Sequence, residues 1–124
     1  MSDSRPLVAV VDDDVSVRES LPDLIRQFGF SVQAFESAAE LLASDRFGEM
    51  RCLIVDVEMP AMSGLELLHK VKHRGYAIPI VFVSGHRSEA LRRRLMEEGA
   101  TECVFKPLSS TALAGAIEVA LRKG

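Results

Sequence analysis

The sequence predicts an α/β fold in which five parallel strands form one sheet with helices on both faces. Short apolar runs alternate with longer amphipathic segments along the whole chain. The first run is continuously apolar, as in strands that are buried on both faces. Because strands and helices alternate, right-handed crossovers place the helices on both sides of a parallel sheet. No repeat or linker interrupts the pattern, so residues 1–124 are expected to form one domain.

The predicted strands are short apolar segments, and they lie at residues 7–11, 31–35, 52–55, 78–83 and 103–105. The second segment alternates between apolar and polar residues. The third delivers Asp56 at its C-terminal end, and a loop at residues 59–64 follows it. Pro79 is tolerable because it lies among the first residues of the fourth strand.

Helices are predicted between the strands, where apolar residues recur at helical spacing. Their apolar positions lie within residues 17–28, 41–42, 65–71, 91–95 and 113–121. The first, third and fourth of these helices are expected to end at Gly29, Gly75 and Gly99, since glycine readily adopts the left-handed conformation that terminates a helix.

Serines and one proline set the expected details of these helices. Ser37 is the expected cap of the short second helix, with Glu40 at the capping-box position. Ser109 or Ser110 is expected to cap the last helix. Pro22 lies inside the first helix and removes one backbone hydrogen bond, which predicts either a kink or a regular part that begins late.

Composition bears on several classes of protein. The 15 basic and 18 acidic residues give a formal charge of −3, so bulk charge favours neither nucleic acid nor a membrane surface as a partner. Hydrophobic residues make up 48%, which argues against disorder. Cys52 and Cys103 lie in apolar runs and are expected to be buried, reduced thiols. Without an apolar leader or a run of membrane-spanning length, the chain is expected in the cytoplasm.

Polar groups follow four of the predicted strands. They are Asp12, Asp13 and Asp14 after the first, Asp56 after the third, Ser84 and Gly85 after the fourth, and Lys106 and Pro107 after the fifth. In an open parallel sheet, sites form at the carboxyl ends of the strands, so these groups are expected to meet. Crowded carboxylates repel each other, and a bound cation offsets that repulsion. Mg²⁺ prefers oxygen ligands, so Asp12 or Asp13, with Asp56 and a backbone carbonyl just after it, is a candidate magnesium site.

Two further groups suit the chemistry of a phosphoryl group. Lys106 carries a compact ammonium for a phosphate or carboxylate oxygen, and Ser84 carries a hydroxyl that can bond a phosphoryl oxygen. Each residue alone has an ordinary alternative: the acidic run as a helix start with Asp14 as the N-cap, Asp56 as a turn former, Lys106 as a solvated lysine, and Ser84 as a hydroxyl bonded to backbone. Their coincidence at four strand ends favours the phosphoryl site.

Four segments resemble the signature segments of bacterial response-regulator receiver domains. They are VDD at residues 11–13, DVEMPAMSG at 56–64, VSGH at 83–86 and FKP at 105–107. Together they extend over most of the chain in the family's order. The second segment is most similar to the FixJ-like branch, whose members often carry a C-terminal helix-turn-helix DNA-binding domain. The resemblance implies a flavodoxin-like three-layer sandwich with strand order 2-1-3-4-5.

The resemblance also implies roles for the site residues. Asp56 would accept a phosphoryl group from a histidine kinase, a histidine phosphotransfer protein or a small phosphodonor. Asp12, Asp13, the Asp56 carboxylate and the backbone carbonyl of Glu58 would hold Mg²⁺. Glu58 also lies two positions after Asp56, at a place that flanks the path of attacking water in such receivers.

Three more implications concern the switch. Lys106 would pair with Asp56 and then with the phosphoryl group, Ser84 would be the switch hydroxyl, and the peptide before Pro107 would be cis. His86 lies two positions after Ser84 and would also flank the path of attacking water, unless it is only an exposed loop histidine.

The implied protein is a regulatory switch that catalyses only its own phosphorylation and dephosphorylation. Its implied partners are the kinase or phosphotransfer protein, a C-terminal DNA-binding output domain or a downstream protein, and a second copy of the chain on phosphorylation. This domain itself is expected to bind neither nucleic acid nor a membrane. One position departs from the family: receivers usually place Tyr or Phe three residues before the lysine, where this chain has Cys103. Aromatic–hydroxyl coupling is therefore expected to be absent or to be achieved in another way.

Other classes remain open. An aspartate-nucleophile phosphatase of the haloacid-dehalogenase type needs a second acid two residues after the nucleophile, and Glu58 offers one. The nucleophile here follows the third strand, however, and the chain has no room for a cap domain. An interaction-only receiver is opposed by the intact site residues, and a flavodoxin-like cofactor carrier by the lack of a hydroxyl-rich phosphate loop after the first strand.

Overall fold

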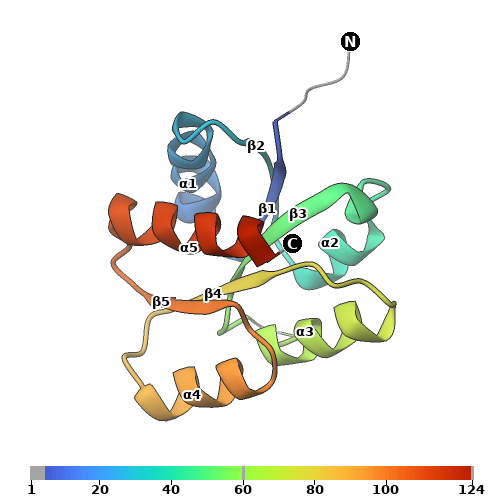
Figure 1. Cartoon of the computed structure of the whole chain (residues 1–124), viewed down its shortest axis with the longest axis vertical. Coiled ribbons are helices and arrows are strands. Elements are labelled where there is room, and N and C mark those ends of the chain that lie inside the picture. Colours follow the sequence, from blue (N-terminus) through green and yellow to red (C-terminus); the bar gives the residue numbers. More distant parts are fainter. Residues whose placement is uncertain (1–4, 60, 124) are drawn as a thin grey trace.

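The computed structural model describes residues 5–59 and 61–123, which form a five-stranded sheet with helices on both faces (Figure 1). The strand order is β2-β1-β3-β4-β5, and every neighbouring pair is parallel. The strands are β1 (Leu7–Val11), β2 (Ser31–Phe35), β3 (Met50–Asp56), β4 (Ile80–Ser84) and β5 (Glu102–Phe105). The α-helices are α1 (Val15–Gln27), α2 (Ala38–Ala43), α3 (Gly64–His73), α4 (Glu89–Glu97) and α5 (Ser110–Lys123). The predicted fold class and strand order are confirmed.

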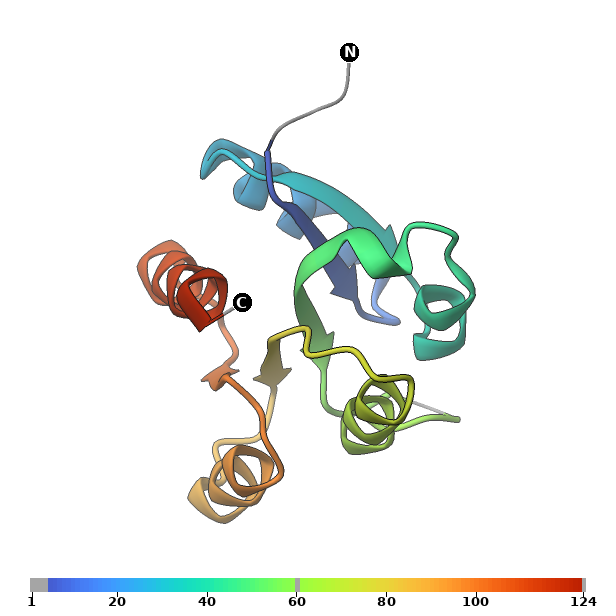
Figure 2. The ribbon, with the colours of Figure 1, turned by 45° about the vertical axis from the view of Figure 1, so that its right-hand side comes forward.

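Two apolar cores lie on opposite faces of the sheet. α1 and α5 pack on one face, and α2, α3 and α4 pack on the other (Figures 1 and 2). β1 supplies both cores: Val8 and Val10 face α1 and α5, whereas Ala9 and Val11 face the opposite helices. All five residues of β1 are buried, which is why this strand reads as a continuous apolar run.

Several strand boundaries differ from the prediction. β3 begins two residues earlier than expected, after a 3₁₀ helix at Phe47–Glu49 that was not predicted. β4 begins at Ile80 rather than at residue 78, and Pro79 precedes it. The carbonyl of Pro79 accepts a hydrogen bond from the Leu53 N–H at 2.9 Å, so this proline joins the sheet through its acceptor. The alternating pattern expected for β2 is not seen in its burial, because β2 is an edge strand and most of its residues are half-buried.

The start of α1 corrects one expectation. The helix begins at Val15 and continues past the buried Pro22, so a regular part that begins late is wrong. Asp14 is the N-cap, and its Oδ1 accepts a hydrogen bond from the Ser16 N–H at 2.8 Å. The helix is therefore capped at its start and continues through the proline.

The serine caps were predicted with mixed success. The Ser37 hydroxyl accepts from the Glu40 N–H as expected, but the Glu40 carboxylate accepts from the Glu36 N–H rather than from that of Ser37. The expected capping box is therefore not closed. Of the two serines considered for α5, Ser109 is the cap, since its hydroxyl accepts from the Ala112 N–H at 3.0 Å.

Two remaining expectations concern the cysteines and the domain limits. Cys52 and Cys103 are free and buried, as expected, and burial raises the pKa of the Cys52 thiol to about 12.

In the described part of the chain, no helix combines the length and the apolar character needed to cross a bilayer. Residues 1–4, Pro60 of the 56–64 motif and Gly124 lie outside the described residues, and a single domain over 1–124 stays a prediction.

Candidate functional site

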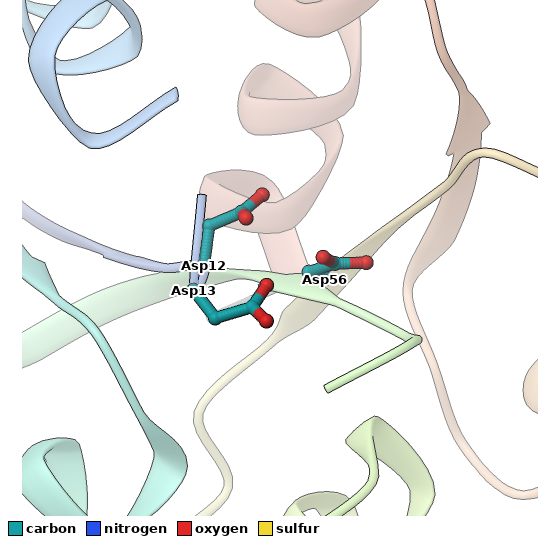
Figure 3. A group of neighbouring side chains, drawn as sticks. All are labelled: Asp12, Asp13 and Asp56. Atoms are coloured by element: carbon teal, nitrogen blue, oxygen red, sulfur yellow. The ribbon is translucent and has the colours of Figure 1, made fainter. Parts of the chain in front are cut away.

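Three carboxylates meet at the carboxyl edge of the sheet. Asp12 and Asp13 follow β1, and Asp56 ends β3, which pairs with β1 in parallel. One oxygen from each of the three carboxylates lies within 4.8 Å of the others (Figure 3). Asp12 and Asp56 are buried, at 3% and 6% exposure, whereas Asp13 is exposed. The site therefore has a buried floor and one acidic side chain open to solvent.

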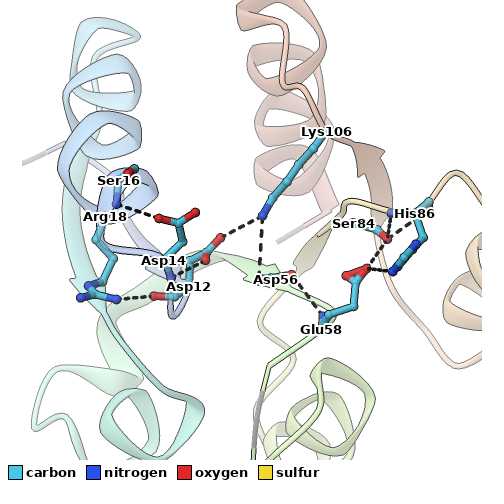
Figure 4. A network of polar contacts seen from close by, with 9 residues as sticks. All are labelled: Asp12, Asp14, Ser16, Arg18, Asp56, Glu58, Ser84, His86 and Lys106. Atoms are coloured by element: carbon cyan, nitrogen blue, oxygen red, sulfur yellow. Dashed lines mark hydrogen bonds and ion pairs between the residues drawn. The ribbon is translucent and has the colours of Figure 1, made fainter.

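Lys106, the residue after β5, reaches this carboxylate cluster. Its Nζ lies 3.6 Å from Oδ2 of Asp12 and 3.8 Å from Oδ2 of Asp56 (Figure 4). Its backbone N–H donates to the Ser84 carbonyl at 2.8 Å, which ties it to the end of β4. The Lys106–Pro107 peptide is cis, as the resemblance implied. Among the described residues, one ammonium thus faces two buried carboxylates.

The surroundings of the Asp56 carboxyl raise its pKa and so favour its neutral form. Burial is the main reason that its pKa is raised from 3.8 to about 6, and the charge of Asp12 raises it further. The charge of Lys106 and the hydrogen bond from the Glu58 N–H act in the opposite direction. A cation beside Asp56 would relieve this repulsion, because it favours the charged carboxylate.

The donor set fits a hard divalent cation. Three carboxylates within a few ångströms are oxygen ligands of the kind that Mg²⁺ takes, and the exposed Asp13 leaves room for the water ligands that Mg²⁺ keeps. Asp12, Asp13 and Asp56 are therefore the residues that could hold a metal ion.

Asp12 is fixed by contacts that sequence reasoning only partly anticipated. Its Oδ1 accepts from the Asp14 N–H at 2.9 Å, and its carbonyl accepts from the guanidinium of Arg18 at 3.0 Å (Figure 4). Arg18 was missed as a site residue. The sequence carries no specific signal for it, since every helix has a residue four positions after its N-cap.

Ser84 and Glu58 form a contact that the sequence did not indicate. Ser84 is fully buried at the end of β4, and its hydroxyl lies 2.9 Å from Oε1 of Glu58 (Figure 4). The Glu58 backbone N–H donates to Oδ1 of Asp56 at 3.1 Å. The sequence singled out the carbonyl of Glu58 as a metal ligand, which stays a prediction; the contacts of its carboxylate and its N–H were not anticipated.

β5 carries one aromatic residue, Phe105 of the FKP segment, and has a cysteine at position 103. Cys103 is buried at the place where the resemblance expects an aromatic ring. Phe105 pairs in register with Ser84, and the Arg87 guanidinium lies 5.7 Å from the centre of its ring. The aromatic side chain of β5 is thus adjacent to Lys106 rather than three residues before it.

Comparisons with known proteins identify the family. The model of the response regulator receiver domain matches residues 8–118. The response regulator protein TodT of Pseudomonas putida is 39% identical over 122 residues, which are 98% of this chain and 54% of TodT. The transcriptional regulatory protein FixJ of Azorhizobium caulinodans is 36% identical over 121 residues, which are 98% of this chain and 57% of FixJ. The chain thus spans little more than half the length of these two relatives.

The fold agrees with these sequence matches. The crystal structure of FixJ-N superposes with a TM-score of 0.85 at 34% identity, and the match covers 98% of this chain and 96% of that one. A family model over nearly the whole chain, together with relatives above 30% identity, establishes membership. The chain belongs to the response-regulator receiver domains of two-component signalling, and its similarity places it in their FixJ-like branch.

Proposed function

We propose that this receiver is a phospho-acceptor in which Asp56 takes a phosphoryl group and thereby switches a partner-binding surface. One observation carries the proposal. A buried carboxylate at the end of β3 lies within 4.8 Å of two further carboxylates and 3.8 Å from a lysine ammonium. Phosphoryl transfer needs positioning and charge neutralisation more than covalent chemistry from the protein, and this arrangement offers both.

The transfer is a displacement at phosphorus. An Oδ atom of Asp56 attacks the phosphorus of a phosphohistidine, the P–N bond breaks, and its electron pair returns to the imidazole of the donor. Lys106 pairs with an oxygen of the transferred group, and Ser84 supplies a hydroxyl for another. Asp12 and Asp13, with the Asp56 carboxylate and the Glu58 carbonyl, would hold Mg²⁺, which supplies positive charge for the phosphoryl oxygens.

The partners follow from the family and are part of the proposal. A histidine kinase or histidine phosphotransfer protein is the phosphodonor, and the cytoplasm is the compartment in which they meet. A C-terminal DNA-binding domain or a downstream protein is the output, and a second copy of the chain is a partner after phosphorylation. The domain acts as a switch on itself rather than on a separate substrate.

The test uses a small phosphodonor. The protein is incubated with acetyl phosphate and Mg²⁺, and its intact mass is measured. We expect the mass to increase by one phosphoryl group, and the increase to disappear when a chelator is added or when Asp56→Asn replaces the wild type. Asp45→Asn, at an exposed position after α2, is the matched control and should be phosphorylated normally. No increase, or an increase that survives Asp56→Asn, would overturn the proposal.

A further inference from the structure

The Ser84 hydroxyl is already engaged in the structure. Its Oγ lies 2.9 Å from Oε1 of Glu58 and 3.1 Å from the carbonyl oxygen of His86, and it accepts from the His86 N–H at 3.1 Å. A hydroxyl has one proton to donate, and a carboxylate is the stronger acceptor, so the proton goes to Glu58. Ser84 therefore has to leave Glu58 before it can donate to anything else.

Glu58 contacts both Asp56 and Ser84 in the phosphoryl site. Its backbone N–H donates to Oδ1 of Asp56, while its carboxylate accepts from the hydroxyl of Ser84. Ser84 has no exposure to solvent, so its hydroxyl needs an acceptor within the protein or on a bound group. The Glu58 side chain is 39% exposed, so its carboxylate can turn toward water and exchange the hydrogen bond from Ser84 for hydrogen bonds from water.

Phosphorylation changes which acceptor the Ser84 hydroxyl favours, the Glu58 carboxylate or the oxygens of the phosphoryl group. The Glu58 charge already disfavours the charged form of Asp56, because it is one of the groups that raise the pKa of that carboxyl. A phosphoryl group would add negative charge and acceptor oxygens at Asp56. Repulsion then favours Glu58 in solvent, and the phosphoryl oxygens offer the buried hydroxyl a replacement acceptor.

We propose that the Glu58 carboxylate is a latch, a positioning residue that holds the Ser84 hydroxyl in the unphosphorylated arrangement and competes with the phosphoryl group for it. This inference rests on the proposed function, since it assigns a regulator to that same site. The latch sets how readily the loop after β4, which begins at Gly85, follows the phosphoryl group. Glu58 thereby helps to set the switching equilibrium by holding Ser84, and not by contacting the phosphoryl group.

The test is a double-mutant cycle with beryllofluoride and Mg²⁺ as the stand-in for a phosphoryl group on Asp56. Wild type, Glu58→Ala, Ser84→Ala and the double variant are titrated, and binding is measured from amide resonances. Glu58→Ala keeps the backbone N–H and carbonyl of residue 58. We expect it to raise the affinity about tenfold, in line with the loss of a competing hydrogen bond to a charged group. In the Ser84→Ala background, Glu58→Ala should raise the affinity for beryllofluoride less than about threefold. There the substitution removes only the repulsion between the Glu58 carboxylate and the bound beryllofluoride.

Two further variants sharpen the cycle. Glu58→Gln keeps an acceptor oxygen without the charge and should show an intermediate gain. Glu118→Ala removes the same charge from the exposed face of α5 and should bind like the wild type. Without any ligand, the His86 amide resonance of Glu58→Ala should move toward its position in the beryllofluoride complex of the wild type. Movement in another direction would report a local structural effect of losing Glu58, because the His86 N–H is bonded to Ser84 and the His86 ring lies beside Glu58.

The outcomes separate the two proposals. Equal gains in the wild-type and Ser84→Ala backgrounds would mean that Glu58 acts through its charge alone, and would overturn the latch. A lower affinity in Glu58→Ala would overturn it as well. If the wild type itself does not bind beryllofluoride, the phosphoryl site fails and the latch fails with it.

Discussion

The ammonium of Lys106 lies 3.8 Å from the carboxylate of Asp56, a group whose pKa burial raises to about 6. The same ammonium lies 3.6 Å from Asp12, so one cation serves two buried acids. The guanidinium of Arg18 adds no second counterion to this pair, because it contacts the carbonyl of Asp12 rather than its carboxylate. Within the described residues, the two buried carboxylates therefore face less positive charge than negative charge, which is the condition that favours a bound cation.

Replacing Lys106 should therefore make Asp56 harder to ionise. In Lys106→Met the charge that lowers the pKa of Asp56 is lost, while burial and the Asp12 charge still raise it. We expect the pKa of Asp56 to rise further above its ordinary value, as measured by carbon NMR titration of the carboxyl group without divalent cations. Lys70→Met, on the exposed side of α3, is the control. An unchanged or lower pKa in Lys106→Met would contradict the electrostatic account.

The raised pKa also predicts how stability depends on pH. Folded Asp56 binds its proton more tightly than the unfolded chain does, so the free energy of unfolding should rise as pH falls through the folded pKa of about 6 toward 3.8. Between about pH 7.5 and about pH 5 this residue should add about 1 kcal/mol. Denaturant unfolding in a chelator, compared between wild type and Asp56→Asn, isolates its share. Identical pH dependence in the two proteins would refute the prediction.

Much of the fold was predictable because local signals and tertiary packing agree. Local signals that point to the observed elements are the apolar runs of β1 and β3, the stops at Gly29, Gly75 and Gly99, and the caps at Asp14 and Ser37. The strand boundaries were less accurate. Pro79 and its neighbour Ile78 extend the apolar run of β4, but the ladder begins at Ile80, where strand partners exist.

Other features depended on signals that were read incompletely. Ser63 and Glu66 form a closed capping box at the start of α3, although the sequence interpretation treated Ser63 only as part of a loop. Their spacing alone carries that signal.

The sequence predicts which residues meet at the site, but it does not predict the hydrogen bonds between them. Parallel strands must bring Asp12, Asp56 and Lys106 to one edge, so their proximity follows from topology. The hydrogen bond from Ser84 to Glu58 joins residues 26 positions apart, and it depends on the path of two loops and on one rotamer. No pattern in the sequence encodes such a contact.

Binding of Mg²⁺ should depend on Asp13. This side chain is exposed, so Asp13→Ala should fold normally while it removes one of the three clustered carboxylates. We expect the affinity for Mg²⁺ to fall roughly tenfold or more, and the rise in Tm that Mg²⁺ produces to shrink accordingly. Calorimetric titration measures the affinity, with Asp45→Ala as the control. Equal affinities in wild type and Asp13→Ala would exclude Asp13 from the metal site.

A pair of glycines tests the packing that supports the site. A Cβ at Gly64 would lie 2.6 Å from the Phe82 ring and 3.2 Å from the backbone of Val57, next to the loop that carries Glu58. Gly64→Ala should therefore destabilise the fold by about 1–3 kcal/mol. Gly115→Ala, in α5, has open space and should stabilise it by roughly 0.5–1 kcal/mol. Denaturant unfolding measures both, and a neutral Gly64→Ala would show that the contact with Phe82 relaxes easily.

The central claim is that Asp56, and neither of its acidic neighbours, carries the phosphoryl group. Borohydride reduces an aspartyl phosphate to homoserine, so reduction of the phosphorylated protein marks the acceptor permanently. Peptide sequencing by mass spectrometry then locates the marked residue. The account predicts homoserine at position 56 alone. Homoserine at position 12 or 13, or at no aspartate in a phosphorylated sample, would contradict it.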